Sequence, residues 1–252
     1  MKKTNQILIN TLIYLGVIAV ILAVYSLLAV IINSSFILPP LSEVLVSFFL
    51  LFTKSNFYIS LLNTLLRTVI AFFICFILAF ILALACYKNK RANAVISPLI
   101  SVIRALPTLA VILLIVIWTN SFIAPIIVTS LVVLPTVFQQ FKNALLEIDK
   151  DQIEMCKLFN VGKNKIYKKV ILPSLAPSTF SVIGTGLSLN LKLMVAGEVL
   201  SATSKSLGNM LNVANVNLQM AEMLGIIVVS VILSLSFELI FELIKKRVVK
   251  WL

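Results

Sequence analysis

Long apolar runs dominate this chain and restrict its fold more than any other feature. Six stretches of 20 or more residues contain few charges, at about 9–32, 64–87, 94–118, 122–141, 175–199 and 220–244. A helix needs about 20 apolar residues to cross a bilayer. Barrel strands would instead alternate apolar and polar residues over about ten positions. The runs therefore predict an all-α, polytopic membrane protein with about six transmembrane helices.

The composition excludes several other classes of protein. The chain is 61% hydrophobic and 12% charged, against about 45–50% apolar and about 25% charged residues in soluble domains. The net charge is +12, but the lysines form short clusters between apolar runs, which favours a lipid bilayer and not a nucleic acid as the partner. No histidine is present, and the three cysteines (Cys75, Cys86 and Cys156) form no CxxC pair. We expect no metal site, no disulfide framework, no catalytic triad and no bound cofactor.

The distribution of basic residues predicts the orientation. The chain begins MKKTNQ and is apolar from Ile7 to Ile32, which is too long for the core of a signal peptide and indicates an uncleaved first span. With the N-terminus inside, the inner segments hold sixteen lysines and arginines and the outer segments hold only Lys54 and Lys205. The positive-inside rule then places both termini in the cytoplasm.

The outer segment 33–63 contains Pro39-Pro40, which ends the first helix. We expect an interfacial helix over 41–62, and its partial insertion stays open. Repeats and linkers are absent, so residues 1–252 form a single transmembrane domain.

The segment 142–172 is polar and basic, unlike its surroundings, and lies between the fourth and fifth spans. Leu145, Ile148, Cys156 and Phe159 fall at helical spacing, and Asn160-Val161-Gly162 then breaks the pattern. A second short helix follows, and Leu172-Pro173 opens the fifth span. These residues alone leave two interpretations open: a loop folded against its own spans, or an element that docks on a soluble partner.

This segment resembles the cytoplasmic signature of permease subunits of bacterial ABC importers. That signature is Glu-Ala-Ala, then a glycine, then Leu-Pro at a fixed spacing. Glu154 matches the acid, Asn160 stands at the glycine position, and Leu172-Pro173 match the end, whereas Met155-Cys156 replace the alanines. Asparagine, like glycine, accepts left-handed backbone angles. The segment is most similar to the branch that imports sulfonates, taurine or nitrate.

The resemblance extends over nearly the whole chain. The further matching positions are Arg67, Arg104-Ala105-Leu106-Pro107, Ile117-Trp118, Pro135, Glu198, Ser206-Leu207-Gly208 and Lys250-Trp251.

The resemblance implies a type I importer permease fold in a bacterial cytoplasmic membrane, without catalysis of its own. It implies a second permease copy, expected to be identical although a heterodimer stays open, two cytoplasmic ATPase subunits and an extracytoplasmic substrate-binding protein. The implied ATPase-coupling residues are Glu154, Met155, Cys156, Phe159, Asn160, Val161, Gly162, Lys163 and Pro173. Gly162-Lys163 is not part of a phosphate loop, so Mg-ATP is expected on the partner subunits.

Polar and charged residues within spans mark the candidate translocation path, since such residues are costly in lipid. The candidates are Lys192, Asn190, Glu198 and Arg67. Arg67 and Arg104 are expected to extend towards the nearest interface. Lys192 either does the same or lines the path and attracts an anionic group. It lies six residues, or about 9 Å, before Glu198 on another helix face, so the two are not expected to pair.

Two other functions stay open. A secondary transporter or channel would need no ATPase, but many such proteins contain internal repeats, which this sequence lacks. A membrane scaffold would need neither the Glu-to-Leu-Pro spacing nor Lys192. The sequence does not specify the substrate, and sulfonates, taurine, nitrate and thiamin-precursor pyrimidines all remain candidates.

Overall fold

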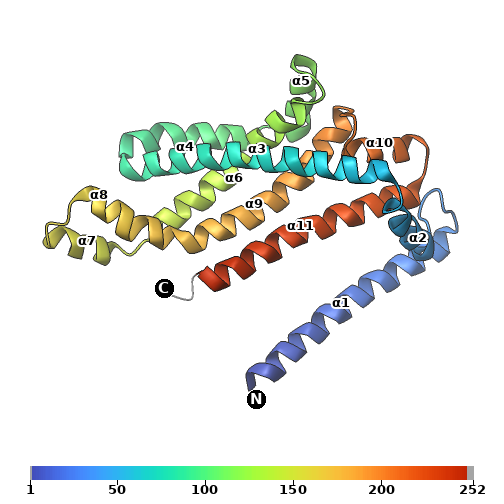
Figure 1. Ribbon diagram of the computed structural model, residues 1–252, viewed down its shortest axis with the longest axis horizontal. Coiled ribbons are helices and arrows are strands. Elements are labelled where there is room, and N and C mark those ends of the chain that lie inside the picture. The colour runs from blue at the N-terminus through green and yellow to red at the C-terminus, as the bar shows by residue number, and fades with distance from the viewer. Residues whose placement is uncertain (1, 249–252) are drawn as a thin grey trace.

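The computed structural model describes residues 2–248, which contain helices and no strand (Figure 1). The predicted all-α class is therefore confirmed. The matched Lys250-Trp251 pair lies outside the described residues. The elements are α1 (Lys2–Ile32), α2 (Leu41–Leu51), α3 (Ser55–Lys88), α4 (Lys90–Ala105), α5 (Thr108–Trp118), α6 (Ala124–Leu146), α7 (Lys150–Leu158), α8 (Lys163–Ile166), a π-helical turn (Tyr167–Ile171), α9 (Leu172–Leu200), α10 (Leu207–Val216) and α11 (Met220–Val248).

Helices α3, α6, α9 and α11 form the body of the molecule, with α6 packed between α3 and α9, and α11 on the other side of α9 (Figure 1). On α3, Ala71, Cys75, Ala79 and Ala83 are buried and recur every four residues. Small side chains on one helix face let neighbouring membrane helices approach closely. Phe141 of α6 belongs to the same buried cluster, edge-on to aromatic rings of α3.

Four described helices are each long and apolar enough to cross a membrane. They are α3, α6, the continuous helix Lys163–Leu200 and α11, and the pair α4–α5 makes a fifth if it counts as one span. On α1, the apolar stretch within the fully described part runs from Gly16 to Ile32. These helices match the predicted runs, with two corrections.

The first correction concerns the predicted third span, 94–118, which is not one straight helix. α4 ends at Ala105, α5 begins at Thr108, and the two helices meet at 90°. Pro107 stands at the break with φ −66° and ψ 114°. A residue before proline is forced into extended backbone, and Leu106 accordingly has ψ 133°. The chain thus turns inside the predicted span.

The second correction concerns the interfacial helix expected over 41–62. α2 ends at Leu51, and residues from Ser55 onwards belong to α3, which runs unbroken for 34 residues. α2 packs on α11, with Val44 and Leu51 buried.

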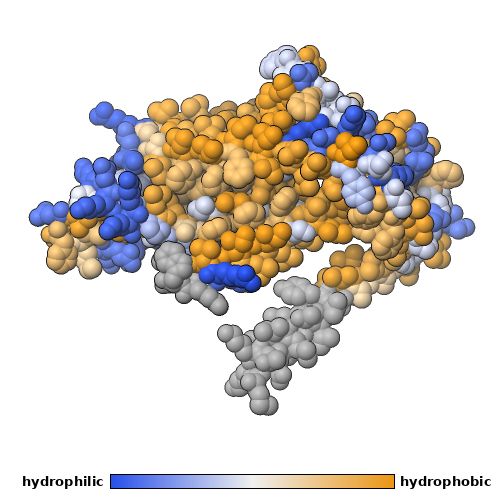
Figure 2. Space-filling model, in the orientation of Figure 1, coloured by the Kyte–Doolittle hydropathy of each residue, from blue (hydrophilic) through white to orange (hydrophobic). Residues whose placement is uncertain are grey.

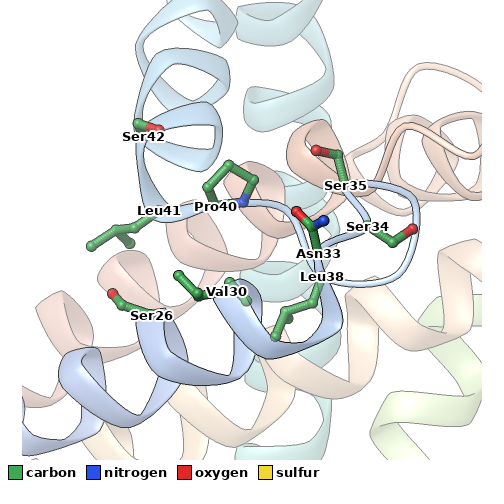
Figure 3. Close-up of a pocket in the computed structure, with 10 residues that line it drawn as sticks. Ser26, Val30, Asn33, Ser34, Ser35, Leu38, Pro40, Leu41 and Ser42 are labelled. Atoms are coloured by element: carbon green, nitrogen blue, oxygen red, sulfur yellow. The ribbon is translucent and has the colours of Figure 1, made fainter.

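Helix α1 contacts α2 at its C-terminal end and otherwise diverges from the bundle (Figure 1). The Tyr25 hydroxyl donates to the Pro39 carbonyl at 2.6 Å and fixes this junction. A cavity of about 450 Å³ lies here (Figure 3), lined by Ser26 and Val30 of α1, by the connecting loop and by the start of α2. It contains none of the predicted site residues.

Candidate functional site

The 142–172 segment lies at one end of the bundle, where hydrophilic residues gather around α7 and α8 and apolar residues are exposed at the tip (Figures 1 and 2). An apolar band covers the helices next to it (Figure 2). The predicted helical spacing of Leu145, Ile148, Cys156 and Phe159 is only partly right. Leu145 belongs to the end of α6, a turn separates α6 from α7, and Phe159 does not share the buried face of Leu145 and Ile148.

Several side chains of the segment face the bundle and hold it in place. Ile153, Cys156 and Val161 are partly buried against the core cluster, and Ile166 is 6% exposed. Cys156 and Val161, predicted as coupling residues, therefore anchor the segment to the chain's own spans.

Other apolar side chains of the segment face outwards. Met155, Leu158 and Phe159 are exposed by 59%, 82% and 79%. Their spacing of three and four residues places them on one side of α7. They form an apolar patch, the Met155–Phe159 patch, at a helix that does not continue into the membrane body. Glu154 and Lys163 are also exposed, and Pro173 is partly buried.

Asn160 ends α7 in a left-handed conformation. Its φ is +51°, and the Val161 N–H donates to the Cys156 carbonyl at 2.9 Å. This hydrogen bond over five residues, with a left-handed residue just before the donor, defines the Schellman motif. Gly162 has φ −59° instead and precedes α8. The expectation that asparagine supports the turn at the signature's glycine position is thus confirmed.

The helix after this turn is continuous with α9. Lys163–Leu200 forms one helix of 38 residues, so Leu172-Pro173 does not open a separate span as predicted. Pro173 has no N–H to donate to the preceding turn, and the helix widens into π geometry over Tyr167–Ile171 instead of ending. Unbroken helix, with one π-helical turn, therefore connects Lys163 to Leu200.

At the far end of α9, Glu198 is fully buried and paired with Arg67. The Arg67 guanidinium lies 2.9 Å from a Glu198 carboxylate oxygen, and Arg67 is only 4% exposed. The same guanidinium stacks 4.7 Å above the Phe122 ring. Arg67 therefore does not extend to an interface as predicted, because a buried partner is available. As expected, Glu198 does not pair with Lys192.

Two further groups complete this arrangement, which we call the Glu198 cluster (Thr64, Arg67, Glu198, Leu207 and Gly208). The Thr64 hydroxyl donates to Glu198 at 2.8 Å and accepts the Leu207 N–H, and the Gly208 N–H donates to Glu198. A side chain at position 208 would collide with Glu198 and the backbone of α9. Sequence reasoning missed Thr64, whose only signal is its position one turn before Arg67.

Lys192 lies elsewhere, on an exposed face of α9. The neighbouring face of α6 exposes Thr136, Gln139 and Asn143, and the Gln140 amide reaches Thr185 of α9 at 3.4 Å. These polar groups lie along the middle of α6 and α9, two helices that are otherwise mostly apolar. Asn190 is different: it is fully buried, and neither its amide nitrogen nor its amide oxygen has a hydrogen-bond partner within the described chain.

No group of three or more metal-ligating side chains occurs in the described residues. The chain is similar to the methionine import system permease protein MetP of Bacillus subtilis (strain 168), with 28% identity over 174 residues that cover 64% of this chain and 77% of that protein.

Two solved structures share the fold. One shows inward-facing conformations of the MetNI methionine ABC transporter, at 20% identity and a TM-score of 0.64, covering 75% of this chain and 94% of that one. The other is an amino acid ABC transporter with histidines, at 21% identity and a TM-score of 0.65, covering 75% and 92%. These relatives are methionine and amino acid transporters and not members of the expected sulfonate, taurine or nitrate branch.

The family model of binding-protein-dependent transport system inner membrane components matches residues 75–251. This match includes α6, the 142–172 segment and all of α9. ATP binding and hydrolysis in such a transporter belong to a partner subunit, and no cofactor is expected on this chain. The chain belongs to this family and is a transmembrane permease subunit of an ABC importer with the type I fold.

Proposed function

We propose that two identical copies of this chain form the membrane path of an importer for a small amino-acid-like solute. Each copy engages one of two ATPase subunits through its 142–172 segment and receives solute from a binding protein on the opposite side. The observation that carries this proposal is the Met155–Phe159 patch. Leu158 and Phe159 are about four-fifths exposed at a well-anchored helix, which is expected of a preformed surface awaiting a partner.

The orientation with both termini in the cytoplasm is part of the proposal. It is supported by the position of Lys163, Lys165, Lys168 and Lys169 at the α7–α8 end together with Lys245, Lys246 and Arg247 at the end of α11. The opposite end carries Lys54 and Lys205 in its loops. Basic loops favour the cytoplasmic side.

The translocation path is proposed along the polar face of α6 and α9. Gln139, Asn143 and Lys192 are exposed on this face of the single chain. Polar side chains in direct contact with lipid are unfavourable and in membrane proteins face a partner or water. A second copy that covers this face would remove the polar groups from lipid and enclose a wet path. Asn190 is buried and is therefore not part of this exposed face.

The Glu198 cluster is proposed to hold the outer end of the path together, and not to line it. Arg67 and Glu198 are buried within one chain and satisfy each other. The solute is proposed from the relatives, whose names refer to methionine and amino acids. Sulfonates, taurine and nitrate are less well supported as solutes, because the names of the relatives described above do not mention them.

Reconstitution tests the proposal. Vesicles that contain this chain, its ATPase and, outside, the loaded binding protein should take up L-methionine or another amino acid only when ATP is enclosed. Collapse of the ion gradients with ionophores should leave uptake unchanged. Uptake that persists without ATP and follows an ion gradient would instead establish the rival function, a secondary transporter.

A further inference from the structure

A second cavity, of about 250 Å³, lies where the α4–α5 break meets the middle of α6 and α9. Its polar groups are Arg104 at the end of α4, Thr108 at the start of α5 and Thr136 of α6. The remaining wall is apolar and includes Val132 and Leu193. Three separate stretches of chain thus converge on one cation and two hydroxyls.

Arg104 is exposed on the single chain and lines the cavity from the far end of α4. It follows Lys90 by fourteen residues of regular helix, or about 21 Å along α4. The expectation that Arg104 extends towards an interface stays a prediction. Within the described part of the chain, Arg104 forms no ion pair. An arginine without an anionic partner is costly within a membrane span, and such residues mark sites of function in membrane proteins.

The chemistry of the lining selects a class of solute. The cavity contains one arginine and no aspartate or glutamate, so it attracts anionic groups and offers nothing to an ammonium group. A guanidinium and neighbouring hydroxyls suit the two oxygens of a carboxylate. The volume is below the roughly 300–1,000 Å³ of pockets for drug-sized ligands, and the apolar wall suits a short hydrocarbon tail.

We propose that this cavity is a solute subsite, in which Arg104 binds the carboxylate of a small solute and the apolar wall accepts its compact apolar tail. The proposal rests on the proposed function, since it assigns this step to the path of the importer. Thr136 hydrogen-bonds the carboxylate, and the 90° break at Pro107 brings Thr108 to the same place. Lys192, on the adjacent exposed face of α9, adds positive potential near the entrance.

Three probes with the same isobutyl tail separate the contributions. 4-Methylpentanoate carries only a carboxylate, L-leucine carries a carboxylate and an ammonium group, and 3-methylbutylamine carries only an ammonium group. Equilibrium binding is measured on the purified permease–ATPase complex in lipid nanodiscs, without binding protein. The two carboxylates should bind, and the amine should bind at least about tenfold more weakly, because a lost charged hydrogen bond is worth about one order of magnitude or more in affinity.

Matched variants locate the binding site. Arg104→Gln should weaken carboxylate binding about tenfold or more, Arg104→Lys should restore part of it, and Thr136→Val should weaken it about threefold. Arg91→Gln is the control, because Arg91 is a cation at the exposed start of the same helix. Size-exclusion chromatography and ATP hydrolysis confirm that each complex is assembled.

The outcomes separate the two proposals. Binding of the amine as tight as that of the carboxylates, or carboxylate binding that Arg104→Gln leaves unchanged in an assembled complex, would overturn the subsite while ATP-driven uptake still supported the importer. Failure of the unmodified chain to assemble with the ATPase would instead overturn the proposed function.

Discussion

The two ends of the 38-residue helix Lys163–Leu200 differ in how far the side chains around them are paired or buried within one chain. At the Leu200 end, Glu198 receives hydrogen bonds from a threonine, an arginine and a backbone amide, and both charges of the Arg67–Glu198 pair are buried. At the Lys163 end, the Met155–Phe159 patch and several lysines face outwards. The charged pair at the first end is satisfied within one chain, whereas the second end exposes apolar side chains, which our proposal assigns to a partner.

The difference shows how one helix serves two purposes. Burial of an ion pair at one end fixes α9 to α3 and α10, because the paired charges can rearrange only at a large cost. The other end is attached mainly by apolar contacts, such as those of Ile153 and Ile166, which are not directional. We therefore expect changes at the Glu198 cluster to affect stability, and changes at the 142–172 segment to affect coupling.

The largest effect on stability is expected from Glu198→Ala. Removal of the carboxylate leaves Arg67 buried without its partner, which costs about 3–5 kcal/mol. Unfolding by SDS in mixed micelles, followed by circular dichroism, measures the loss. The control is Lys54→Ala, which breaks an ion pair at the same end that is much more exposed and should cost under about 1 kcal/mol. Equal losses in both variants would contradict the account.

Gly208→Val is expected to have the next largest effect. A side chain at this position collides with Glu198 and with the backbone of α9, and forced overpacking costs about 1–3 kcal/mol. Gly162→Ala is the matched control, because a methyl group there meets no atom within 4 Å. The same SDS titration compares the two variants, and a stable Gly208→Val protein would show that α10 is not tightly held.

Asn160→Ala should have a smaller effect, confined to the 142–172 segment. Left-handed backbone costs alanine about 1 kcal/mol more than it costs asparagine or glycine. Hydrogen exchange of the amides in α7 should become faster in Asn160→Ala and stay slow in Asn160→Gly. Unchanged exchange in the alanine variant would mean that the Schellman turn does not hold α7.

Lys192→Gln should leave stability unchanged, because Lys192 is exposed and makes no ion pair within the described residues. Uptake of a carboxylate-bearing solute should fall a few-fold through the loss of positive potential, and Lys192→Arg should retain it. Equal uptake by the unmodified chain and Lys192→Gln would remove Lys192 from the path.

Local sequence patterns predicted the spans and one turn of this molecule. They did not predict contacts between residues that are far apart in the sequence. The apolar runs located the spans, and the residue type of Asn160 predicted its left-handed turn, since both depend on neighbours in sequence. The Arg67–Glu198 pair joins residues 131 positions apart, and no local pattern indicates it. The 90° break at Leu106-Pro107 carried a local signal, the residue-before-proline restriction, which the continuous apolar run obscured.

The 142–172 segment was assigned through its resemblance to a signature and not through its pattern. The amphipathic spacing grouped Phe159 with Leu145 and Ile148, although Phe159 is exposed and the other two are buried. A short turn between α6 and α7 resets the helical phase, so periodicity counted across it was misleading. The resemblance does not depend on this phase, because it rests on the residues at Glu154, Asn160 and Leu172-Pro173.

Coupling in the double variant Leu158→Ser/Phe159→Ser tests the central claim most directly. Both side chains are exposed in the single chain, so the variant should unfold at the same SDS fraction as the unmodified protein. In vesicles with the ATPase and loaded binding protein, it should lose most ATP-driven uptake and the stimulation of ATP hydrolysis by the binding protein. Full uptake and full stimulation in this variant would contradict the account.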